Sequence, residues 1–428
     1  MINMMRARRS RTAGLAVTAA AAALVLAACG GASGGDATAG GGEEGGSVTL
    51  WMYPVIADPT ASTEYWDGVV DRFTEAHSDI DFTVELQPWD GRLERVTTAL
   101  ASGSGPDIVL LTPEQVNQFA EAGSVQPVND LLEDGVEPFN ENATGSVTVD
   151  GETFAVPIYQ TVLAPAYNTA LLDELGLEIP TTWDDVREIA PEVVDAGYSV
   201  FDFGASPDAA LNVTFFPFLW QAGGNVFTRD GSDIAIDSPE AIEALEFLVD
   251  LHEMGALAPD TPTVGHELEG RPFWLGDAIM HYGLDLSQVR QSAEILGEDN
   301  VVAGMPLTGE EQATYGVPGL LAVSHAAEDT EAVGTVLSFL SSPEEQVQLS
   351  DASGFFPARA DAEVEHADEY AEVLFEASKV AVPGEIHPES PQVQSLLGPK
   401  IQAAFLGQLT PEEAFTQAAE EARAQIGK

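Results

Sequence analysis

The sequence contains a single cysteine, Cys29, so no intrachain disulfide can form. Basic residues are also scarce: 16 lysines and arginines stand against 70 aspartates and glutamates, giving a formal net charge of −54. A surface of this sign repels nucleic acid and anionic lipid headgroups, and we expect neither as a partner. The acidic residues are spread along the chain, which favours a solvated surface suited to high salt. The same composition without a salt requirement is the alternative.

The sequence also lacks the spaced motifs of common enzymes. Its seven histidines show no H-E-x-x-H spacing and have no cysteine partners, so we expect no metal site. No Walker-type phosphate loop is present, and we expect no cofactor. A G-x-S-x-G match at residues 31–35 lies in a low-complexity stretch, without the flanking strand and helix that a nucleophile elbow requires.

An apolar run near the N-terminus is too short to cross a bilayer but fits a secretion signal. Four arginines lie within the first eleven positions, and residues 13–28 form a run of 16 small and apolar residues, below the roughly 20 of a membrane-spanning helix. The run ends in LAACG at residues 26–30, which resembles the lipobox of bacterial lipoproteins. This resemblance implies a lipoprotein signal peptide over 1–28 and lipidation of Cys29. An ordinary signal peptide with a chance cysteine is the alternative, and the export route stays open.

Residues 29–46 join this leader to the rest of the chain. After Cys29 they are rich in glycine, alanine and serine, and such a tract cannot bury apolar surface. We therefore expect a flexible tether with a root-mean-square span of roughly 20–25 Å. A tether of this length would let a globular body reorient beside a membrane.

The body of the chain alternates strand and helix patterns. Residues 48–53 and 81–86 have the pattern of strands, and between them apolar residues recur at helical spacing over 66–76. A second helix is expected to begin at Asp90, followed by a buried strand over 108–111. This order predicts an α/β fold with a parallel-rich sheet, and 428 residues suit two packed lobes plus a leader.

Several helices have recognisable starts. A serine or threonine followed three residues later by an acid is a capping-box pattern. It occurs at Thr182–Asp185, Ser342–Glu345 and Thr410–Glu413. Proline stands at the first expected helical position after Ser238, Ser342 and Thr410. No repeat of fixed period is visible, which argues against solenoids and propellers.

Ten short stretches, taken in order, carry a family resemblance. They are 99–108 (ALASGSGPDI), 119–123 (FAEAG), 154–157 (FAVP), 167–169 (YNT), 175–177 (LGL), 180–185 (PTTWDD), 221–224 (QAGG), 273–280 (FWLGDAIM), 339–344 (FLSSPE) and 354–359 (GFFPAR). Each is weak alone, but their order and spacing cover nearly all of residues 47–428. Together they resemble the extracellular solute-binding proteins of ATP-binding-cassette sugar importers, the maltose-binding-protein-like group.

The resemblance implies a two-lobe periplasmic-binding-protein fold of type II, with a hinge and an interlobe cleft. Family topology places lobe one at 47–157 plus 303–352 and lobe two at 158–302 plus 353–428, with the first crossing near residues 158–160. Ligand would lie beyond the carboxyl ends of the strands and would stabilise a closed state by hinge motion. The implied partners are an importer's permease and ATPase subunits. The resemblance also implies that the chain is a monomer and that a lipid anchors it to the outer face of the cytoplasmic membrane.

A sugar site needs flat aromatic faces for stacking and planar carboxylates or amides for paired hydrogen bonds. Trp66, Trp183 and Trp274 are expected to pack in the core, because they lie in helix patterns or before a glycine turn. The aromatic candidates for ligand contact lie at strand ends, before a helix start or near a family motif: Trp51, Tyr53, Trp89 and Trp220. Core packing is the alternative for each.

Polar candidates come from loops that would face the cleft. Thr112 and Glu114 follow a buried strand, and Tyr159 and Gln160 lie at the presumed crossing. The resemblance adds positions in regions that approach ligand in this family: Asn212, Tyr282, Asp285 and Gly319. Gly319 would let backbone amides come close to the ligand. A solvated loop or turn is the alternative for each polar candidate.

The expected function is to bind a carbohydrate, without catalysis, and to deliver it to the permease. The scarcity of lysine and arginine favours a neutral mono- or oligosaccharide, or a cationic solute, over a phosphorylated or carboxylated ligand. The family often carries a stacking tryptophan where this sequence has GLDL at 283–286, which points to a different or smaller ligand. The alternatives are a secreted carbohydrate-active hydrolase, an importer component for a polyol or polyamine, and a structural envelope lipoprotein. The sequence does not identify the ligand.

Overall fold

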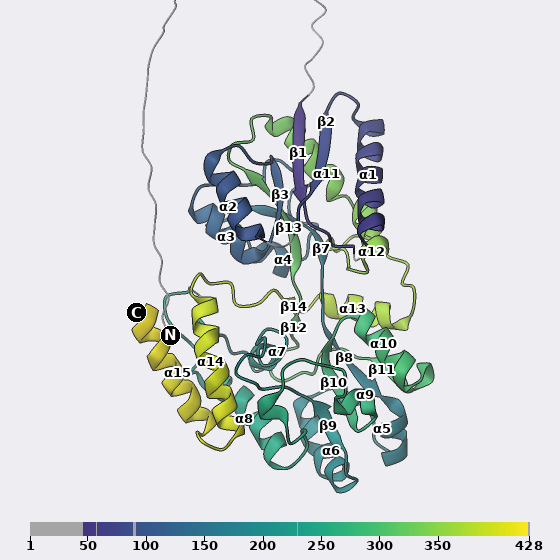
Figure 1. The fold of residues 1–428 in the computed structure, drawn as a ribbon, viewed down its shortest axis with the longest axis vertical. Coiled ribbons are helices and arrows are strands. Elements are labelled where there is room, and N and C mark those ends of the chain that lie inside the picture. The colour runs from purple at the N-terminus through teal and green to yellow at the C-terminus, as the bar shows by residue number, and fades with distance from the viewer. Residues whose placement is uncertain (1–45, 57, 89–90, 229, 427–428) are drawn as a thin grey trace, which may run out of the picture. The chain divides into compact units, whose positions relative to one another are not determined.

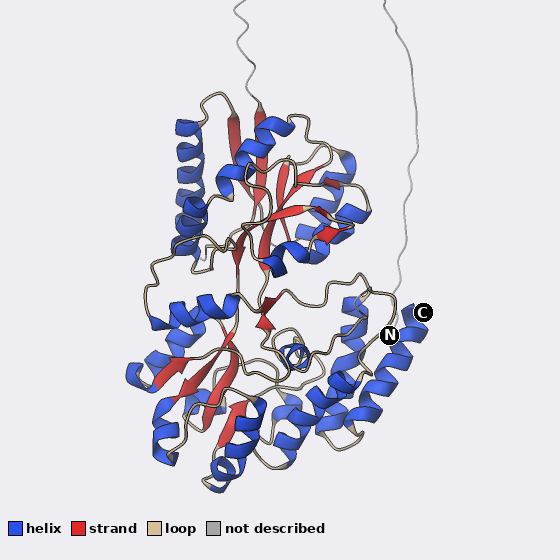
Figure 2. Ribbon diagram, turned by 180° about the vertical axis from the view of Figure 1, so that it is seen from behind, coloured by secondary structure: helices blue, strands red, loops and turns tan. Residues whose placement is uncertain are grey.

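The computed structural model describes residues 46–56, 58–88, 91–228 and 230–426. The predicted signal peptide, Cys29, the tether up to residue 45 and Trp89 therefore lie outside the described residues. Strands form two separate groups, each surrounded by helices (Figure 2). We call the part built around the six-stranded sheet the first lobe and the part built around the four-stranded sheet the second lobe.

The first lobe has the sheet order β2–β1–β3–β13–β4, with β7 also paired to β13. Its strands are β1 (Ser47–Met52), β2 (Asp81–Leu86), β3 (Ile108–Leu111), β4 (Val125–Gln126), β7 (Ala155–Gln160) and β13 (Pro318–Ser324). Strand β1 pairs in parallel with β2 and β3, as the strand–helix alternation predicts. Strand β13 arrives from much later in the chain and is antiparallel to β3, β4 and β7, so the sheet is mixed.

Helices and one hairpin complete the first lobe. Helix α1 runs alongside β2 (Figure 1). The helices are α1 (Pro59–Ala76), α2 (Arg92–Ser102), α3 (Pro113–Glu121), α4 (Glu141–Gly145), α11 (Thr330–Leu340) and α12 (Pro343–Ser353), and the hairpin joins β5 (Thr148–Val149) to β6 (Glu152–Thr153). The predicted strands at 81–86 and 108–111 are confirmed. Helix α2 begins at Arg92, after Gly91 in the left-handed conformation.

The second lobe has the sheet order β11–β8–β10–β9, built from β8 (Ala164–Asn168), β9 (Ser199–Asp202), β10 (Ala278–Leu284) and β11 (Val301–Ala303). Its helices are α5 (Thr169–Leu175), α6 (Trp183–Asp195), α7 (Phe216–Gln221), α8 (Pro239–Glu253), α9 (Pro272–Leu275), α10 (Leu286–Leu296), α13 (Glu369–Ser378), α14 (Ser390–Phe405) and α15 (Pro411–Ile426), with short 3₁₀ turns at Thr261–Thr263 and Glu298–Asn300. A small parallel pair, β12 (Thr314–Tyr315) with β14 (Ala381–Val382), lies beside this lobe.

The predicted helix starts at Thr182, Ser238, Ser342 and Thr410 are confirmed, but at Ser342 only half of the predicted capping box forms: the Glu345 N–H donates to Ser342 Oγ, whereas the Glu345 carboxylate bonds to Arg72. The Thr182 and Asp185 side chains bond reciprocally to each other's backbone N–H at the start of α6. Thr410 and Glu413 do the same before α15. Such caps satisfy backbone donors that a helix end otherwise leaves without partners.

Each lobe has its own apolar core, and two of the three tryptophans expected there, Trp66 and Trp183, are buried in it. Trp66 is 3% exposed in the first-lobe core, and Trp183 is 4% exposed in the second. The Trp183 ring stacks on Phe247 with ring centroids 4.3 Å apart. Trp274 is half-buried, and its indole N–H donates to Ser292 Oγ at 2.8 Å.

Backbone contacts tie together the segments that run between the lobes. The Thr161 amide donates to the Val317 carbonyl at 3.0 Å, and the Leu163 amide donates to the Tyr315 carbonyl at 2.9 Å. Between these bonds sits Gly316, where a Cβ atom would lie 2.1 Å from the Thr161 carbonyl oxygen. The predicted lobe boundaries stay a prediction, but the segments at 161–163 and 315–317 are in direct contact.

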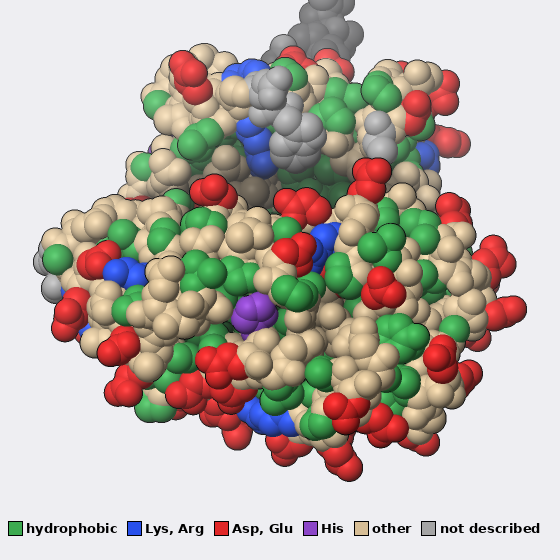
Figure 3. Space-filling view, turned by 60° about the horizontal axis from the view of Figure 1, so that its bottom comes forward, with side chains coloured by type: hydrophobic (Ala, Val, Ile, Leu, Met, Phe, Trp, Pro, Cys, Tyr) green, Lys and Arg blue, Asp and Glu red, His purple; other side chains and the backbone are tan. Residues whose placement is uncertain are grey.

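The face drawn in Figure 3 carries many scattered acidic side chains and few basic ones. This distribution agrees with the scarcity of lysine and arginine in the sequence. Over the described residues, the structure contains no helix with the length and apolar character needed to cross a membrane.

Candidate ligand-binding site

A cavity of about 510 Å³ lies between elements of the two lobes. One wall is α4 of the first lobe, with Glu141 and Asn142. The other walls are Trp220 at the end of α7, the loop 225–231 and the segment 382–387. The Asn142 side-chain amide donates to the Ala381 carbonyl at 3.2 Å and so joins α4 to β14. A cavity of this size suits a small organic ligand.

Trp220, one of the predicted aromatic candidates, lines this cavity. Trp220 is only 5% exposed, and its indole N–H donates to Glu385 Oε1 at 2.9 Å. The ring is therefore largely buried and is held by a carboxylate that also lines the cavity. A second aromatic wall is formed by Phe227 and His387, whose rings are stacked with centroids 4.0 Å apart and planes 15° apart.

A second group of predicted residues surrounds Tyr315, the residue of β12 paired with Val382 of the cavity wall. Burial and, to a smaller extent, the negative charge of Glu114 raise the pKa of Tyr315 to about 12, against the effect of a hydrogen bond from the Asn212 side chain. Glu114 of the first lobe and Asn212 of the second therefore both act on one hydroxyl group. Asn212 and Glu114 are both sequence-predicted candidates.

Asn212 also lies against the wall of the cavity. A Cβ atom on Gly384 would lie 3.2 Å from Asn212 Oδ1, and Gly384 has φ of +104°, a conformation that favours glycine. Asn212 Oδ1 is buried and has no hydrogen-bond partner among the described groups. A buried amide oxygen without a partner is unfavourable unless a ligand or water supplies a donor. Among the predicted polar candidates, Asn212 thus lies next to the cavity wall at Gly384 without itself lining the cavity.

Two further candidates, Tyr53 and Tyr159, lie near Arg92 at the start of α2. The Arg92 guanidinium carbon lies 4.5 Å from the centroid of the Tyr53 ring, and Arg92 Nη2 donates to the Leu110 carbonyl at 2.8 Å. Burial raises the pKa of Tyr159 to about 12, and the charge of Arg92 opposes this shift. Burial lowers the pKa of Arg92 itself. Tyr53 is fully buried, so it supports Arg92 more than it presents a face to ligand.

Other predicted residues are engaged in local structure. The Trp51 indole donates to Glu85 Oε2 at 2.7 Å across the β1–β2 pair. Thr112 forms a capping box with Gln115 at the start of α3. Asp285 is exposed and forms a capping box with Gln288 at the start of α10. These contacts explain why such residue types stand at strand and helix ends.

The last three candidates lie in the interior. Tyr282 is 3% exposed, and its hydroxyl contacts the Gln221 side chain. The Gln160 side-chain amide donates to the Thr161 carbonyl at 2.8 Å. Gly319 pairs with Tyr159, and a Cβ atom at Gly319 would lie 2.0 Å from the Tyr159 ring. Its missing side chain thus makes room for a protein ring.

Sequence reasoning missed Glu385, Asn142, Phe227 and His387, all of which line the cavity. They lie in loops and in the short helix α4, where no periodicity marks them. The acid at Glu385 is one of 70 in the chain, so its residue type carried no signal.

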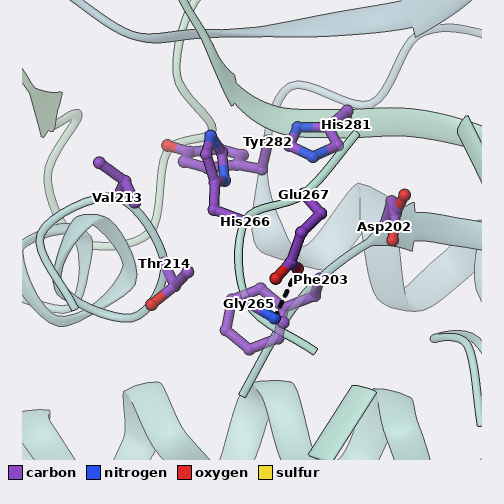
Figure 4. A pocket seen from close by; sticks show the side chains of 10 residues that line it. Asp202, Phe203, Val213, Thr214, Gly265, His266, Glu267, His281 and Tyr282 are labelled. Carbon is purple, nitrogen blue, oxygen red and sulfur yellow. Dashed lines mark hydrogen bonds between the residues drawn. The ribbon is translucent and has the colours of Figure 1, made fainter. Parts of the chain in front are cut away.

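A small, separate cavity of about 10 Å³ lies inside the second lobe, roughly the space of one water molecule (Figure 4). It is lined by Asp202, His266 and His281, with the two imidazole centroids 5.1 Å apart. Arg271 is buried and bonds to Asp202. Over the described part of the chain, no three His, Cys, Asp or Glu side chains are grouped so as to hold a metal ion.

We expect the two histidines at this cavity to make the fold acid-sensitive. Burial, with the nearby charges of His266 and Arg271, lowers the pKa of His281 well below its usual range, and burial lowers the pKa of His266. Below about pH 6.5 the unfolded chain binds protons that the folded imidazoles do not, so the free energy of unfolding falls by about 1 kcal/mol per pH unit toward pH 5. Thermal unfolding between pH 8 and pH 5 measures this loss of stability.

A variant pair separates this effect from general acid sensitivity. His281→Phe should reduce the slope of stability against pH over this range, whereas His325→Gln, at an exposed position, should leave it unchanged. An unaltered slope in His281→Phe would contradict the assignment.

Comparison with known proteins supplies the remaining observation. A family model described as bacterial extracellular solute-binding protein matches residues 57–347. An arabinooligosaccharide-binding protein of Halalkalibacterium halodurans is 30% identical over 187 residues, covering 42% of this chain and 41% of that protein.

Two solved structures share the fold. A cyclic α-maltosyl-1,6-maltose-binding protein of Arthrobacter globiformis has a TM-score of 0.75 at 24% identity, covering 88% of this chain and 98% of that one. An extracellular solute-binding protein of Staphylococcus aureus in complex with maltose has a TM-score of 0.76 at 17% identity, covering 89% and 98%. At these identities the likeness shows the two-lobe fold alone, and it agrees with the expected fold class.

Proposed function

We propose that this chain, which belongs to the bacterial extracellular solute-binding proteins, binds a carbohydrate in the cavity between its two lobes and delivers it to an importer. The observation that carries the proposal is the composition of the cavity. Aromatic rings of Trp220 and Phe227 lie beside the side chains of Asn142 and Thr228, with Asn212 adjacent. Aromatic rings suit sugar C–H faces, and amides and hydroxyls suit sugar hydroxyl groups.

The named relatives support the carbohydrate class. One is named for binding arabinooligosaccharides, another for binding a cyclic maltosyl-maltose, and a third was solved with maltose. The volume of about 510 Å³ favours an oligosaccharide over a single sugar ring. The ligand would be released unchanged to permease and ATPase subunits, with the body tethered outside the cytoplasmic membrane through lipidated Cys29.

A thermal-shift screen of the body lacking residues 1–28 tests this proposal. Mono- and oligosaccharides, polyols and polyamines are compared in low and high salt. A saccharide at a hundred times its dissociation constant should stabilise the fold by about 2.7 kcal/mol through mass action. Stabilisation by a polyamine alone would overturn the carbohydrate assignment, and release of new reducing ends from an oligosaccharide would overturn the assignment as a non-catalytic binder.

Replacing Asn212 with alanine should weaken binding of the best saccharide roughly tenfold, because the amide would lose its hydrogen bonds to ligand hydroxyls. Isothermal titration measures the dissociation constant. The matched control is Asn300→Ala, a half-buried amide that bonds to the Leu296 carbonyl, whereas Asn212 lies next to Gly384 of the cavity wall. Equal affinities in the two variants would remove Asn212 from the site.

A further inference from the structure

We propose that Glu385 is a positioning residue, whose carboxylate fixes Trp220 and the loop 225–228 in the arrangement that the ligand meets. This inference rests on the proposed function of the cavity and assigns a role to a residue that no sequence motif marks. Glu385 lies on the segment 382–387 that follows β14, and it lines the cavity.

Both oxygens of Glu385 are used by groups from other parts of the chain. Oε1 accepts the Trp220 indole N–H at 2.9 Å, and Oε2 accepts the Val226 backbone N–H at 3.2 Å. These partners lie 165 and 159 positions away in the sequence. One carboxylate therefore joins three walls of the cavity: the end of α7, the loop that follows it, and its own segment.

The burial of Glu385 shows why these two bonds matter. The residue is 8% exposed, and burial raises the pKa of its carboxyl group, while the bonds from Trp220 and Val226, with the backbone of Phe227, lower it. Among the described lysines and arginines, none forms an ion pair with Glu385. A buried carboxylate without a cation depends on its N–H donors for stabilisation. The carboxylate and its N–H donors therefore keep one another in place.

Glu385 acts on the ligand through these partners. Each oxygen already accepts one N–H group and keeps acceptor capacity for another donor, so the carboxylate can hold Trp220 and Val226 in place whether or not it also meets the ligand. Trp220 is 5% exposed, so a small rotation of its ring would change which of its atoms face the cavity. Phe227, next to Val226, forms the second aromatic wall by stacking on His387. Loss of the carboxylate should therefore disturb both aromatic walls.

The test uses the body lacking residues 1–28 and two readouts. Nitrogen-15 NMR follows the Trp220 indole N–H, assigned with Trp220→Phe, and the Val226 amide. Isothermal titration gives the dissociation constant for the best saccharide from the screen. In Glu385→Ala both N–H resonances should move, and affinity should fall by roughly tenfold or more. Unmoved resonances, or affinity within twofold of the original chain, would overturn the proposal.

Glu385→Gln keeps one acceptor oxygen and replaces the other with a donor. It should leave one of the two resonances in place, move the other, and lose less affinity than Glu385→Ala. If the alanine variant fails to fold, Glu385→Gln alone tests the proposal. Two unmoved resonances in this variant would overturn the positioning role. Glu389→Gln, on the same stretch of chain, is the control for loss of one negative charge and should change neither readout.

The two proposals fail in different ways. If the unaltered protein binds no saccharide, the carbohydrate assignment fails, but the two resonances still report on Glu385. Movement of both in Glu385→Ala then upholds the positioning of the cavity walls, and unmoved resonances overturn it.

Discussion

Replacing Gly316 with alanine is expected to destabilise the fold by about 3 kcal/mol, at the upper end of the range for overpacking. The new Cβ would lie 2.1 Å from the Thr161 carbonyl oxygen and 3.0 Å from the Ala381 Cβ. The first contact is with backbone, which cannot rotate away. The segments at 161–163 and 315–317 are hydrogen-bonded on both sides of Gly316, so separating them also breaks those bonds.

Denaturant unfolding measures this loss, and Gly145→Ala is the matched control. Gly145 lies in α4 with no atom within 4 Å of the Cβ position and with no left-handed φ, so alanine there should change stability by less than about 1 kcal/mol. A Gly316→Ala protein as stable as the control would show that the two segments separate easily.

Replacing Arg271 with methionine is expected to destabilise the fold by about 3–5 kcal/mol at neutral pH. Arg271 bonds to Asp202 and Asp260, and the Arg271 and Asp202 side chains are 8% and 2% exposed. Without the guanidinium, the Asp202 charge is left buried with no cation. Asp202 Oδ2 already has no hydrogen-bond partner among the described groups, so little local compensation is available.

The pH dependence of this loss identifies its cause. Burial raises the pKa of Asp202 even with Arg271 present. In the variant the folded state should take up a proton at a pH where the unfolded carboxyl has released it, so the deficit relative to the original chain shrinks as the pH falls. Arg290→Met is the control: its pair with Asp368 is 42% and 35% exposed, and its loss should cost at most about 1 kcal/mol. A deficit independent of pH would contradict a buried charge as the cause.

Local patterns in the sequence located several elements and helix starts, although α2 begins at Arg92 and not at the expected Asp90. Alternation marked 81–86 as a strand, and Thr182 with Asp185 marked the start of α6. The direction of β13 was not accessible in this way, because pairing with β3, more than 200 residues earlier, depends on the path of the intervening chain. The prediction of a parallel-rich sheet therefore holds for β1, β2 and β3 but not for the whole sheet.

The candidate site was harder to predict than the fold. Trp220 lines the cavity and Asn212 lies next to its wall at Gly384, but Trp51 is bonded to Glu85 and Tyr53 is fully buried. Sequence shows that an aromatic residue ends a strand, but not which surface the lobes will enclose. Glu385 depends on contacts across about 160 residues, and no local pattern encodes such contacts.

The chain path through the first sheet has a consequence for biogenesis. Strand β13 lies inside that sheet, bonded to β3, β4 and β7, yet it is made only after all four strands of the second sheet. A chain emerging from its N-terminus thus lacks an interior strand of its first lobe until residue 324 is available. Until then the first sheet cannot be completed, because β3, β4 and β7 lack the strand that pairs with all three of them.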